Sequence, residues 1–128
     1  MHYRKDWFAN ENLKVPETTD DLIAAAQKLT GAKDGAQRFG VSGYFASIHA
    51  PNFFQNFAAP NEGYTFDQKG TIVIDSDQVF QAMKTVNTLV PSFAPGYVNL
   101  QYGDTRNLFI EGKLGIEIDS TSMAVSVI

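Results

Sequence analysis

Apolar residues recur at helical spacing in several segments of the chain. The clearest helix is predicted over residues 19–30, because a hydroxyl N-cap at Thr18 and an acidic first turn precede a regular apolar series. Gly31 is expected to end this helix. Its inward face is expected to contain Leu22, Ile23, Ala26 and Leu29.

Three more helices are predicted from caps and periodicity. One covers residues 51–59 and begins with a proline, and the next is capped by residues 75–77 and ended by Pro91. Asp104 caps a short helix that ends at Gly112. The expected inward residues are Phe53, Phe54 and Phe57 in the first, Val79, Phe80, Met83, Val86 and Val90 in the second, and Leu108 and Phe109 in the third.

Short apolar stretches between these helices predict strands. Residues 39–44 and 114–118 are predicted as single strands. Residues 64–66 and 71–74 flank a turn that contains Gly70, which predicts a small hairpin.

The remaining segments complete a layered α/β domain. Residues 91–103 are predicted as an ordered loop, and residues 119–122 resemble the start of another helix. The chain stops six residues later in the apolar segment 123–128, so we expect it to be a piece of a longer protein. Helices that alternate with strands predict one α/β domain over residues 1–128, with a short mixed sheet flanked by helices.

Composition narrows the function classes. The chain has 128 residues, 44% of them hydrophobic, with a net charge of −4 and no cysteine. This length supports a core without a metal or disulfide, and the lack of a basic cluster argues against nucleic-acid binding. The first six residues contain no apolar segment of the kind that a signal peptide needs, so either the protein is cytoplasmic or its targeting segment lies outside this chain.

Catalytic and metal-binding patterns are weak. Glu117 and Asp119 form a close carboxylate pair at a strand end, where a glycosidase could keep an acid and a base, but a helix cap and a solvated strand end account for them more simply. His2 and His49 are too few for a zinc site or a triad. The sequence therefore predicts no catalytic residues and no cofactor.

Four motifs in order carry a family resemblance. Tyr3-Arg4-Lys5-Asp6-Trp7-Phe8 is similar to Tyr-x-Lys-Asp-x-Phe, and Pro16-Glu17-Thr18-Thr19-Asp20-Asp21-Leu22 is similar to Pro-x-Thr-Trp-Asp-Glu-Leu. The strand at Phe39-Gly40-Val41 comes next, and residues 109–116 match Phe-x-x-Gly-Lys-x-Ala-Met. In this order they resemble the extracellular solute-binding proteins of ABC importers, in particular the carbohydrate-binding family with maltodextrin receptors.

This resemblance implies a fold and a function. The family binds solutes in a cleft between two α/β lobes of the type II periplasmic-binding-protein fold, and the chain would be most of the second lobe, without the first lobe or the export signal. The implied function is to bind a small-molecule solute, with a carbohydrate as the leading choice, and to deliver it to an ABC permease. The implied location is the periplasm or the outer face of the cytoplasmic membrane, with or without a lipid anchor. An isolated lobe would expose its hinge and cleft, so weak self-association is expected.

The resemblance also places the binding residues in two loops. Receptors of this family line the cleft with the loops that follow strands and with helix N-termini, as open α/β sheets generally do. Aromatic rings stack on apolar ring faces, and polar groups pair with hydroxyls. The expected ligand-binding residues are Tyr44, Phe45, Ser47, His49 and Asn52 in the first loop, and Asp119, Ser120, Thr121 and Ser122 in the second.

Several alternatives stay open. Ser120-Thr121-Ser122 stands where sugar receptors often have Gly-x-Trp, so the usual stacking indole is absent at that point. A polyamine is an alternative solute because of Asp119, and an organic anion because of the helix start that follows it. A carbohydrate-active enzyme that uses Glu117 and Asp119, or a purely structural domain, are alternatives from other classes.

Overall fold

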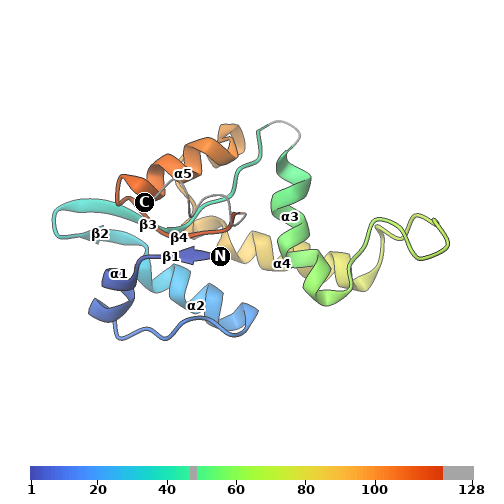
Figure 1. The fold of residues 1–128 in the computed structure, drawn as a ribbon, viewed down its shortest axis with the longest axis horizontal. Coiled ribbons are helices and arrows are strands. Elements are labelled where there is room, and N and C mark those ends of the chain that lie inside the picture. The colour runs from blue at the N-terminus through green and yellow to red at the C-terminus, as the bar shows by residue number, and fades with distance from the viewer. Residues whose placement is uncertain (47–48, 120–128) are drawn as a thin grey trace.

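The computed structural model describes residues 1–46 and 49–119 and places a small mixed sheet between helices (Figure 1). The strands are β1 (His2–Tyr3), β2 (Gly31–Lys33), β3 (Ala36–Val41) and β4 (Leu114–Glu117), in the order β1-β4-β3-β2. The central pair β3 and β4 is parallel, and both outer pairs are antiparallel. The prediction of a mixed sheet flanked by helices is therefore confirmed.

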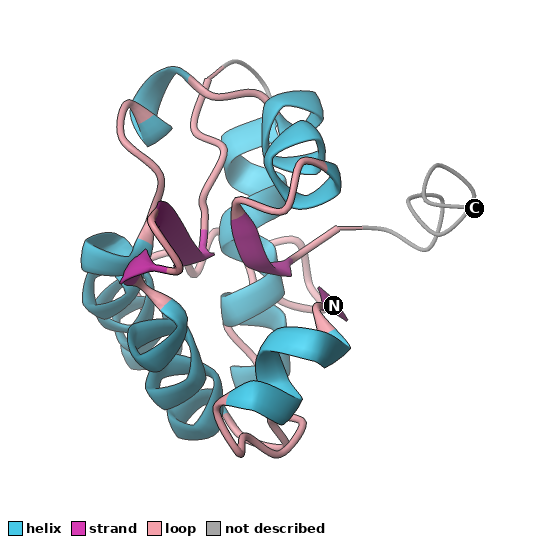
Figure 2. Cartoon of the chain, turned by 90° about the vertical axis from the view of Figure 1, so that its left-hand side faces the viewer, coloured by secondary structure: helices cyan, strands magenta, loops and turns pink. Residues whose placement is uncertain are grey.

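Five α-helices surround the sheet. They are α1 (Lys5–Asn10), α2 (Thr19–Leu29), α3 (Ala50–Ala58), α4 (Asp77–Leu89) and α5 (Tyr102–Ile110), with short 3-10 turns at Ala59–Asn61, Val90–Ser92 and Tyr97–Asn99. Helix α5 lies on one side of the sheet, and α1 and α2 lie on the other (Figure 1, Figure 2). Helices α3 and α4 pack together beyond the end of the sheet.

The local signals at α2 are confirmed. The Thr18 hydroxyl accepts from the Asp21 backbone N–H at 3.1 Å, and the Asp21 carboxylate accepts from the Thr18 N–H at 3.0 Å. This reciprocal pair satisfies donors that the first turn would otherwise leave open. The helix ends at Leu29, with Thr30 as its C-cap, and Gly31 is already the first residue of β2.

Helix α5 begins earlier than predicted. Its N-cap is Gln101 rather than Asp104, and Asp104 instead occupies the third helical position, where its carboxylate accepts from the Gln101 N–H at 2.8 Å. An acidic residue three positions after the cap is the second half of a capping box. This shift places Tyr102 on the first turn of the helix.

The predicted inward face of α4 is partly wrong. Phe80 and Met83 are 55% and 52% exposed, whereas Ala82 and Leu89 are fully buried together with nearly buried Val79. Residues 79, 82, 86 and 89 recur at helical spacing and form the face toward the core. The two large residues lie on the neighbouring face, where the Lys84 ammonium sits 4.6 Å from the centre of the Phe80 ring.

The strands predicted at residues 39–44 and 114–118 are correct in place but differ in extent, and the predicted hairpin is wrong. Strand β3 begins at Ala36 and stops at Val41, three residues before the predicted end. Residues 64–74 make one isolated antiparallel bridge, between Phe66 and Ile72, instead of two strands. The Asp67 carboxylate accepts from two backbone N–H groups of this turn. These local side-chain hydrogen bonds take the place of the backbone hydrogen bonds between paired strands.

Gly40 sets how closely the sheet approaches α2. A β-carbon at this position would lie 1.8 Å from the carbonyl oxygen of Ala26, which is far inside contact distance. Both Ala26 and Leu29 of α2 are almost completely buried against the sheet. Glycine is therefore required here by close backbone packing.

Residues 62–76 project from the body of the protein as an arm (Figure 1). This arm exposes Phe66 and Ile72 at 56% and 65%. Exposed apolar groups of this size favour association. We therefore expect weak self-association of the 128-residue chain, which the double substitution Phe66→Ser and Ile72→Ser should reduce. Sedimentation velocity at increasing concentration measures this, and an unchanged monomer in both forms would contradict the expectation.

Candidate functional site

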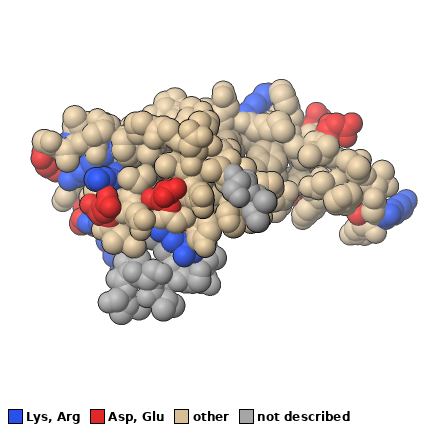
Figure 3. All heavy atoms as spheres, turned by 90° about the horizontal axis from the view of Figure 1, so that it is seen from above, with Lys and Arg blue, Asp and Glu red and all other residues tan. Residues whose placement is uncertain are grey.

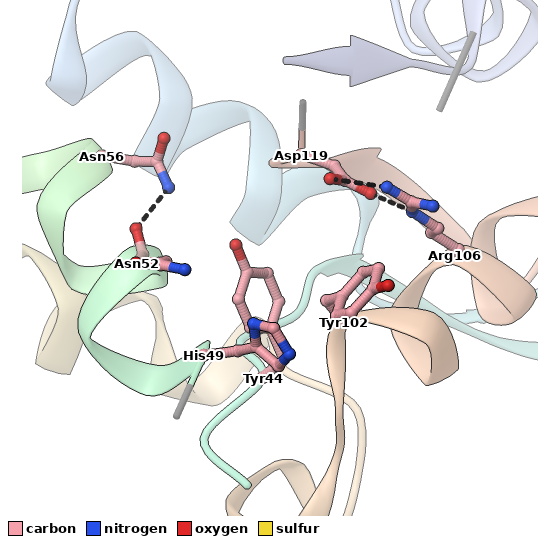
Figure 4. Close-up of a pocket in the computed structure, with 7 residues that line it drawn as sticks. All are labelled: Tyr44, His49, Asn52, Asn56, Tyr102, Arg106 and Asp119. Atoms are coloured by element: carbon pink, nitrogen blue, oxygen red, sulfur yellow. Dashed lines mark hydrogen bonds and ion pairs between the residues drawn. The ribbon is translucent and has the colours of Figure 1, made fainter. Parts of the chain in front are cut away.

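A cavity of about 450 Å³ lies where the first turn of α5, helix α3 and the end of β4 meet (Figure 4). Its side chains come from four separate segments of the sequence and are mostly aromatic or polar. They are Tyr44, His49, Asn52, Asn56, Tyr102, Arg106 and Asp119.

Helix α3 supplies two amides to one wall. Asn52 and Asn56 are four residues apart and therefore share a face of the helix. The Asn56 side-chain amide donates to the Asn52 backbone carbonyl at 2.9 Å, which holds that side chain along the helix (Figure 4). A carboxamide has both donors and acceptors, so this wall can pair with groups of either kind.

Helix α5 supplies the opposite wall by the same spacing. Tyr102 and Arg106 lie one turn apart, and the Arg106 guanidinium is 4.7 Å from the centre of the Tyr102 ring. His49, just before α3, meets the same ring edge to face at 4.7 Å between centroids. Tyr102 therefore contacts Arg106 on its own helix and His49 at the start of α3, so it connects the two walls of the cavity.

An ion pair closes the cavity next to β4. The Arg106 guanidinium donates to both carboxylate oxygens of Asp119, with Nη2 at 3.1 Å from Oδ1. The side chain of Asp119 is 8% exposed and that of Arg106 is 20% exposed, so water screens the pair only partly. The carboxylate raises the pKa of Arg106. The two charges offset each other, which leaves the lining with little net charge.

Tyr44 has both a packing role and a lining role. Its ring is 6% exposed and meets the fully buried Phe53 edge to face, with 5.0 Å between centroids. Its hydroxyl points toward the cavity (Figure 4). Burial is the main cause that raises the pKa of Tyr44, and the charge of Asp119 adds to it. Tyr44 is therefore a neutral hydrogen-bonding group near neutral pH.

Glu117 lies behind this wall and does not line the cavity. It is 0% exposed, and its Oε1 atom is 2.8 Å from the Thr105 hydroxyl. The expectation of a solvated strand end at Glu117 is therefore wrong, because β4 is covered along its whole length. A carboxyl group enclosed in this way cannot reach a substrate in the cavity.

Four of the nine residues predicted for binding line the cavity. Tyr44, His49, Asn52 and Asp119 come together there. Phe45 does not line this cavity: it is partly buried and packs against the aromatic core, 5.3 Å from Phe53 and 5.6 Å from Tyr97 between ring centroids. Ser47, Ser120, Thr121 and Ser122 lie outside the described residues, as does the predicted helix start at residues 120–122.

Three lining residues were missed from the sequence. Asn56 lies one helical turn after Asn52 and could have been found by that spacing. Tyr102 and Arg106 were missed because the predicted helix began at Asp104, which removed the four-residue relation between them. Their proximity to Asp119 is a tertiary contact that no local pattern indicates.

The lining of the cavity combines amides, hydroxyl groups and aromatic rings around one ion pair. Within residues 1–46 and 49–119, no group of three His, Cys, Asp or Glu side chains is placed to hold a metal ion.

On the face shown in Figure 3, charged side chains gather toward the ends, and the surface between them is mostly uncharged. None of the helices in the described part of the chain is long and apolar enough to cross a membrane.

Solved structures identify the fold as that of periplasmic binding proteins. The chain is similar to an ABC transporter solute-binding protein from Agrobacterium vitis S4 with bound D-mannitol, at a TM-score of 0.85 and 25% identity over 98% of the chain. It is also similar to one from Thermotoga lettingae TMO bound with alpha-D-tagatose, at a TM-score of 0.85 and 20% identity over 98% of the chain. A third, from Agrobacterium radiobacter K84 in complex with ribitol, has a TM-score of 0.80 and 22% identity over 90% of the chain.

The sequence comparisons give the family. The family model for bacterial extracellular solute-binding proteins matches residues 1–128, and the chain belongs to this family. It is 28% identical over 127 residues, or 98% of its length, to the putative ABC transporter periplasmic-binding protein YcjN of Escherichia coli (strain K12). The resemblance found in the four sequence motifs is thereby confirmed.

The chain is much shorter than the proteins that it matches. It spans 29% of the length of YcjN, and 29%, 31% and 33% of the ribitol, D-mannitol and alpha-D-tagatose complexes.

Proposed function

We propose that this chain forms one wall of the solute cleft of an ABC importer's receptor, and that the solute is a neutral polyhydroxylated molecule, a sugar or a sugar alcohol. The observation that carries the proposal is the cavity itself, in which amides, hydroxyls and aromatic rings surround an ion pair whose charges offset each other. The ribitol, D-mannitol and alpha-D-tagatose bound by the three similar proteins support this class of solute.

The lining chemistry favours hydroxyl groups. Asn52 and Asn56 present amides, and Asp119 presents a carboxylate to the same space. Tyr44 and Tyr102 add hydroxyl groups and ring faces, against which the C–H face of a sugar can pack. A ligand with many hydroxyls and little charge uses all of these groups.

The charge balance disfavours the two charged alternatives. A polyamine would have to compete with Arg106 for the Asp119 carboxylate, and an organic anion would have to compete with Asp119 for the guanidinium. Either exchange breaks a partly buried pair and leaves one of its members without that compensation. A neutral solute avoids this cost.

The proposal places this chain in one lobe of a two-lobe receptor. We assign residues 1–128 to the second lobe, as the four sequence motifs imply. Similar proteins are about three times as long, which leaves room for the other lobe. Closure of the two lobes around the solute would enclose what one wall cannot, and the closed form would then dock on a membrane permease. The place of action would be outside the cytoplasm, as in the periplasmic relative.

Catalysis is not part of the proposed function. The relatives are solute-binding proteins of transporters rather than enzymes. Glu117 is enclosed behind Thr105, and Asp119 is held by Arg106, so this carboxylate pair is not arranged as a free acid and base. An enzyme would lose turnover when both residues are changed to amides, whereas the receptor is expected to show no turnover in either form.

A thermal-shift panel on the full-length receptor tests the solute class. Monosaccharides, oligosaccharides, sugar alcohols, polyamines and organic anions are added at saturating concentration. A ligand at a hundred times its dissociation constant adds about 2.7 kcal/mol of stability, which moves the melting midpoint by several degrees. We expect a shift with sugars or sugar alcohols and no product formed. A shift with a charged solute alone would contradict the proposed class.

A further inference from the structure

A buried carboxyl group joins the first turn of α5 to the end of β4. Glu117 and Thr105 are both 0% exposed. The Thr105 hydroxyl lies 2.8 Å from Oε1 of Glu117 and 2.9 Å from the backbone carbonyl oxygen of Tyr102. These contacts connect the elements that carry Arg106 and Asp119 at the cavity.

The number of protons available for these contacts indicates which form of Glu117 the structure holds. A threonine hydroxyl has one proton, and a backbone carbonyl oxygen can only accept. When Thr105 donates to the Tyr102 carbonyl, its contact with Glu117 is a hydrogen bond only if Glu117 is the donor. A carboxylic acid has that proton and a carboxylate does not, so only the neutral acid satisfies both contacts at once.

The second carboxyl oxygen points to the same form. Oε2 of Glu117 is buried and has no hydrogen-bond partner in the described part of the chain. An ionised carboxylate with one such oxygen would lose much of its solvation without replacement, whereas the neutral acid loses far less. Burial is the main cause that raises the pKa of Glu117 to about 8.

Charged and titratable groups surround Glu117 from several elements. After burial, the next influence on the pKa of Glu117 is Thr105, because a hydrogen bond donated by its hydroxyl favours the ionised form. The charge of Asp119 opposes ionisation, while Arg106 on α5 and the amino group of Met1 favour it. His2 of β1 lies directly opposite in the sheet register. The loop after β3 contributes the hydroxyl of Tyr44, and the charge of Glu117 is one of the causes that raise the pKa of Tyr44. Helix α2 meets β4 with the apolar side chain of Leu29.

We propose that Glu117 is a positioning residue: as a neutral acid it donates to the Thr105 hydroxyl, which in turn donates to the backbone carbonyl of Tyr102, and these bonds hold the first turn of α5 against β4. In alkaline solution the ionised Glu117 accepts the hydrogen bond from Thr105 instead, so the bond to Tyr102 is lost and an incompletely solvated charge lies between α5 and β4, which loosens that turn. The proposal rests on the proposed function in so far as Tyr102 and Arg106 contact the solute. Its consequence is that the cavity keeps its shape at neutral pH and loses it above about pH 8.

Two measurements without solute test the protonation and the anchoring. Carbon-13 NMR of the glutamate carboxyl groups in the full-length receptor follows the titration of Glu117, assigned with Glu117→Gln. Hydrogen exchange, corrected for intrinsic rates, follows the protection of the amides at residues 105–107. We expect Glu117 to titrate near pH 8, and protection to fall between pH 7 and pH 9 in the original protein. Glu117→Gln should keep its protection, because a carboxamide N–H replaces the acid proton.

Solute binding supplies the third measurement, with D-mannitol as the probe. A receptor that binds only in the neutral form loses affinity in proportion to the ionised fraction, so the dissociation constant should rise up to about tenfold between pH 7 and pH 9. Glu117→Gln should remove this rise. Glu111→Gln is the matched control, because Glu111 is an exposed residue at the end of α5 and should leave the rise unchanged.

The outcomes separate this proposal from the proposed function. Titration of Glu117 below about pH 6, or loss of protection in Glu117→Gln equal to that in the original protein, would overturn the role of Glu117. If no sugar or polyol binds at pH 7, the proposed function fails, and the NMR and exchange results still decide whether Glu117 anchors α5. A pH-dependent affinity that persists in Glu117→Gln would also overturn the proposal.

Discussion

Gly40→Ala is expected to destabilise the protein by about 3 kcal/mol or more, at the upper end of what overpacking costs. The added β-carbon would lie 1.8 Å from the Ala26 carbonyl oxygen, 2.5 Å from its carbonyl carbon and 2.6 Å from its Cα. All three atoms belong to the backbone, so no side chain can turn aside to make room. Relief requires β3 and α2 to move apart, which would open the core around Leu29. Urea denaturation followed by circular dichroism measures the loss.

Gly103→Ala is the matched control for this substitution. Gly103 lies in the first turn of α5, and a β-carbon there would meet nothing within 4 Å. Alanine is preferred to glycine inside a helix by roughly 0.5–1 kcal/mol, so this change should be neutral or slightly stabilising. Equal unfolding midpoints for the two variants would show that close packing at Gly40 does not limit stability.

Arg106→Met is expected to have the largest effect on binding. The substitution removes the guanidinium that offsets the charge of the nearly buried Asp119 carboxylate and that lies against the Tyr102 ring. Loss of one member of a buried ion pair lowers the stability of the folded protein by about 3–5 kcal/mol. In the full-length receptor we expect D-mannitol affinity to fall by at least about tenfold, equivalent to 1.4 kcal/mol. Isothermal titration calorimetry measures this fall.

A second substitution identifies charge balance as the cause. Asp119→Asn in the Arg106→Met background removes the carboxylate charge that Arg106 no longer offsets, and it should recover much of the lost stability. In the single variant a polyamine such as spermidine should bind better than in the original receptor, because Asp119 is then available to a cation. Lys113→Met is the control, since its pair with Glu111 is more than half exposed on both sides and contributes little. Unchanged mannitol affinity in Arg106→Met would contradict the role of the Arg106–Asp119 pair in the binding wall.

Local signals were reliable where one segment satisfies its own backbone. Thr18 and Asp21 begin α2 as predicted, because both partners of the capping box lie within one turn. Ser76 begins α4 with a single cap bond that is equally local, because its hydroxyl accepts from the Val79 backbone N–H. At α5 the same signal was present but misread by three residues, since Asp104 serves as the third residue of the box rather than as its cap.

Short strands and exposed apolar residues were less predictable. Strands β1 and β2 have two and three residues, too few for a periodic pattern, and they exist because neighbouring strands supply partners. Phe80 and Met83 are apolar residues that stay exposed, because the packing of α4 turns the face with Val79, Ala82 and Leu89 toward the core. Apolar character alone therefore does not decide which face of a helix is buried.

Caps, periodicity and four ordered motifs were enough to predict the α/β class, the main helices, the family and four of the residues that line the cavity. Three features became apparent only from the packed structure: Phe45 lies against the core, Tyr102 and Arg106 share the cavity with Asp119, and Glu117 is enclosed. Caps and periodicity depend on neighbours a few residues apart, which a sequence displays directly. The ion pair joins residues 13 apart, and the cavity brings residues 44 and 119 together. Such contacts depend on how the elements pack, and packing is a property of the whole chain.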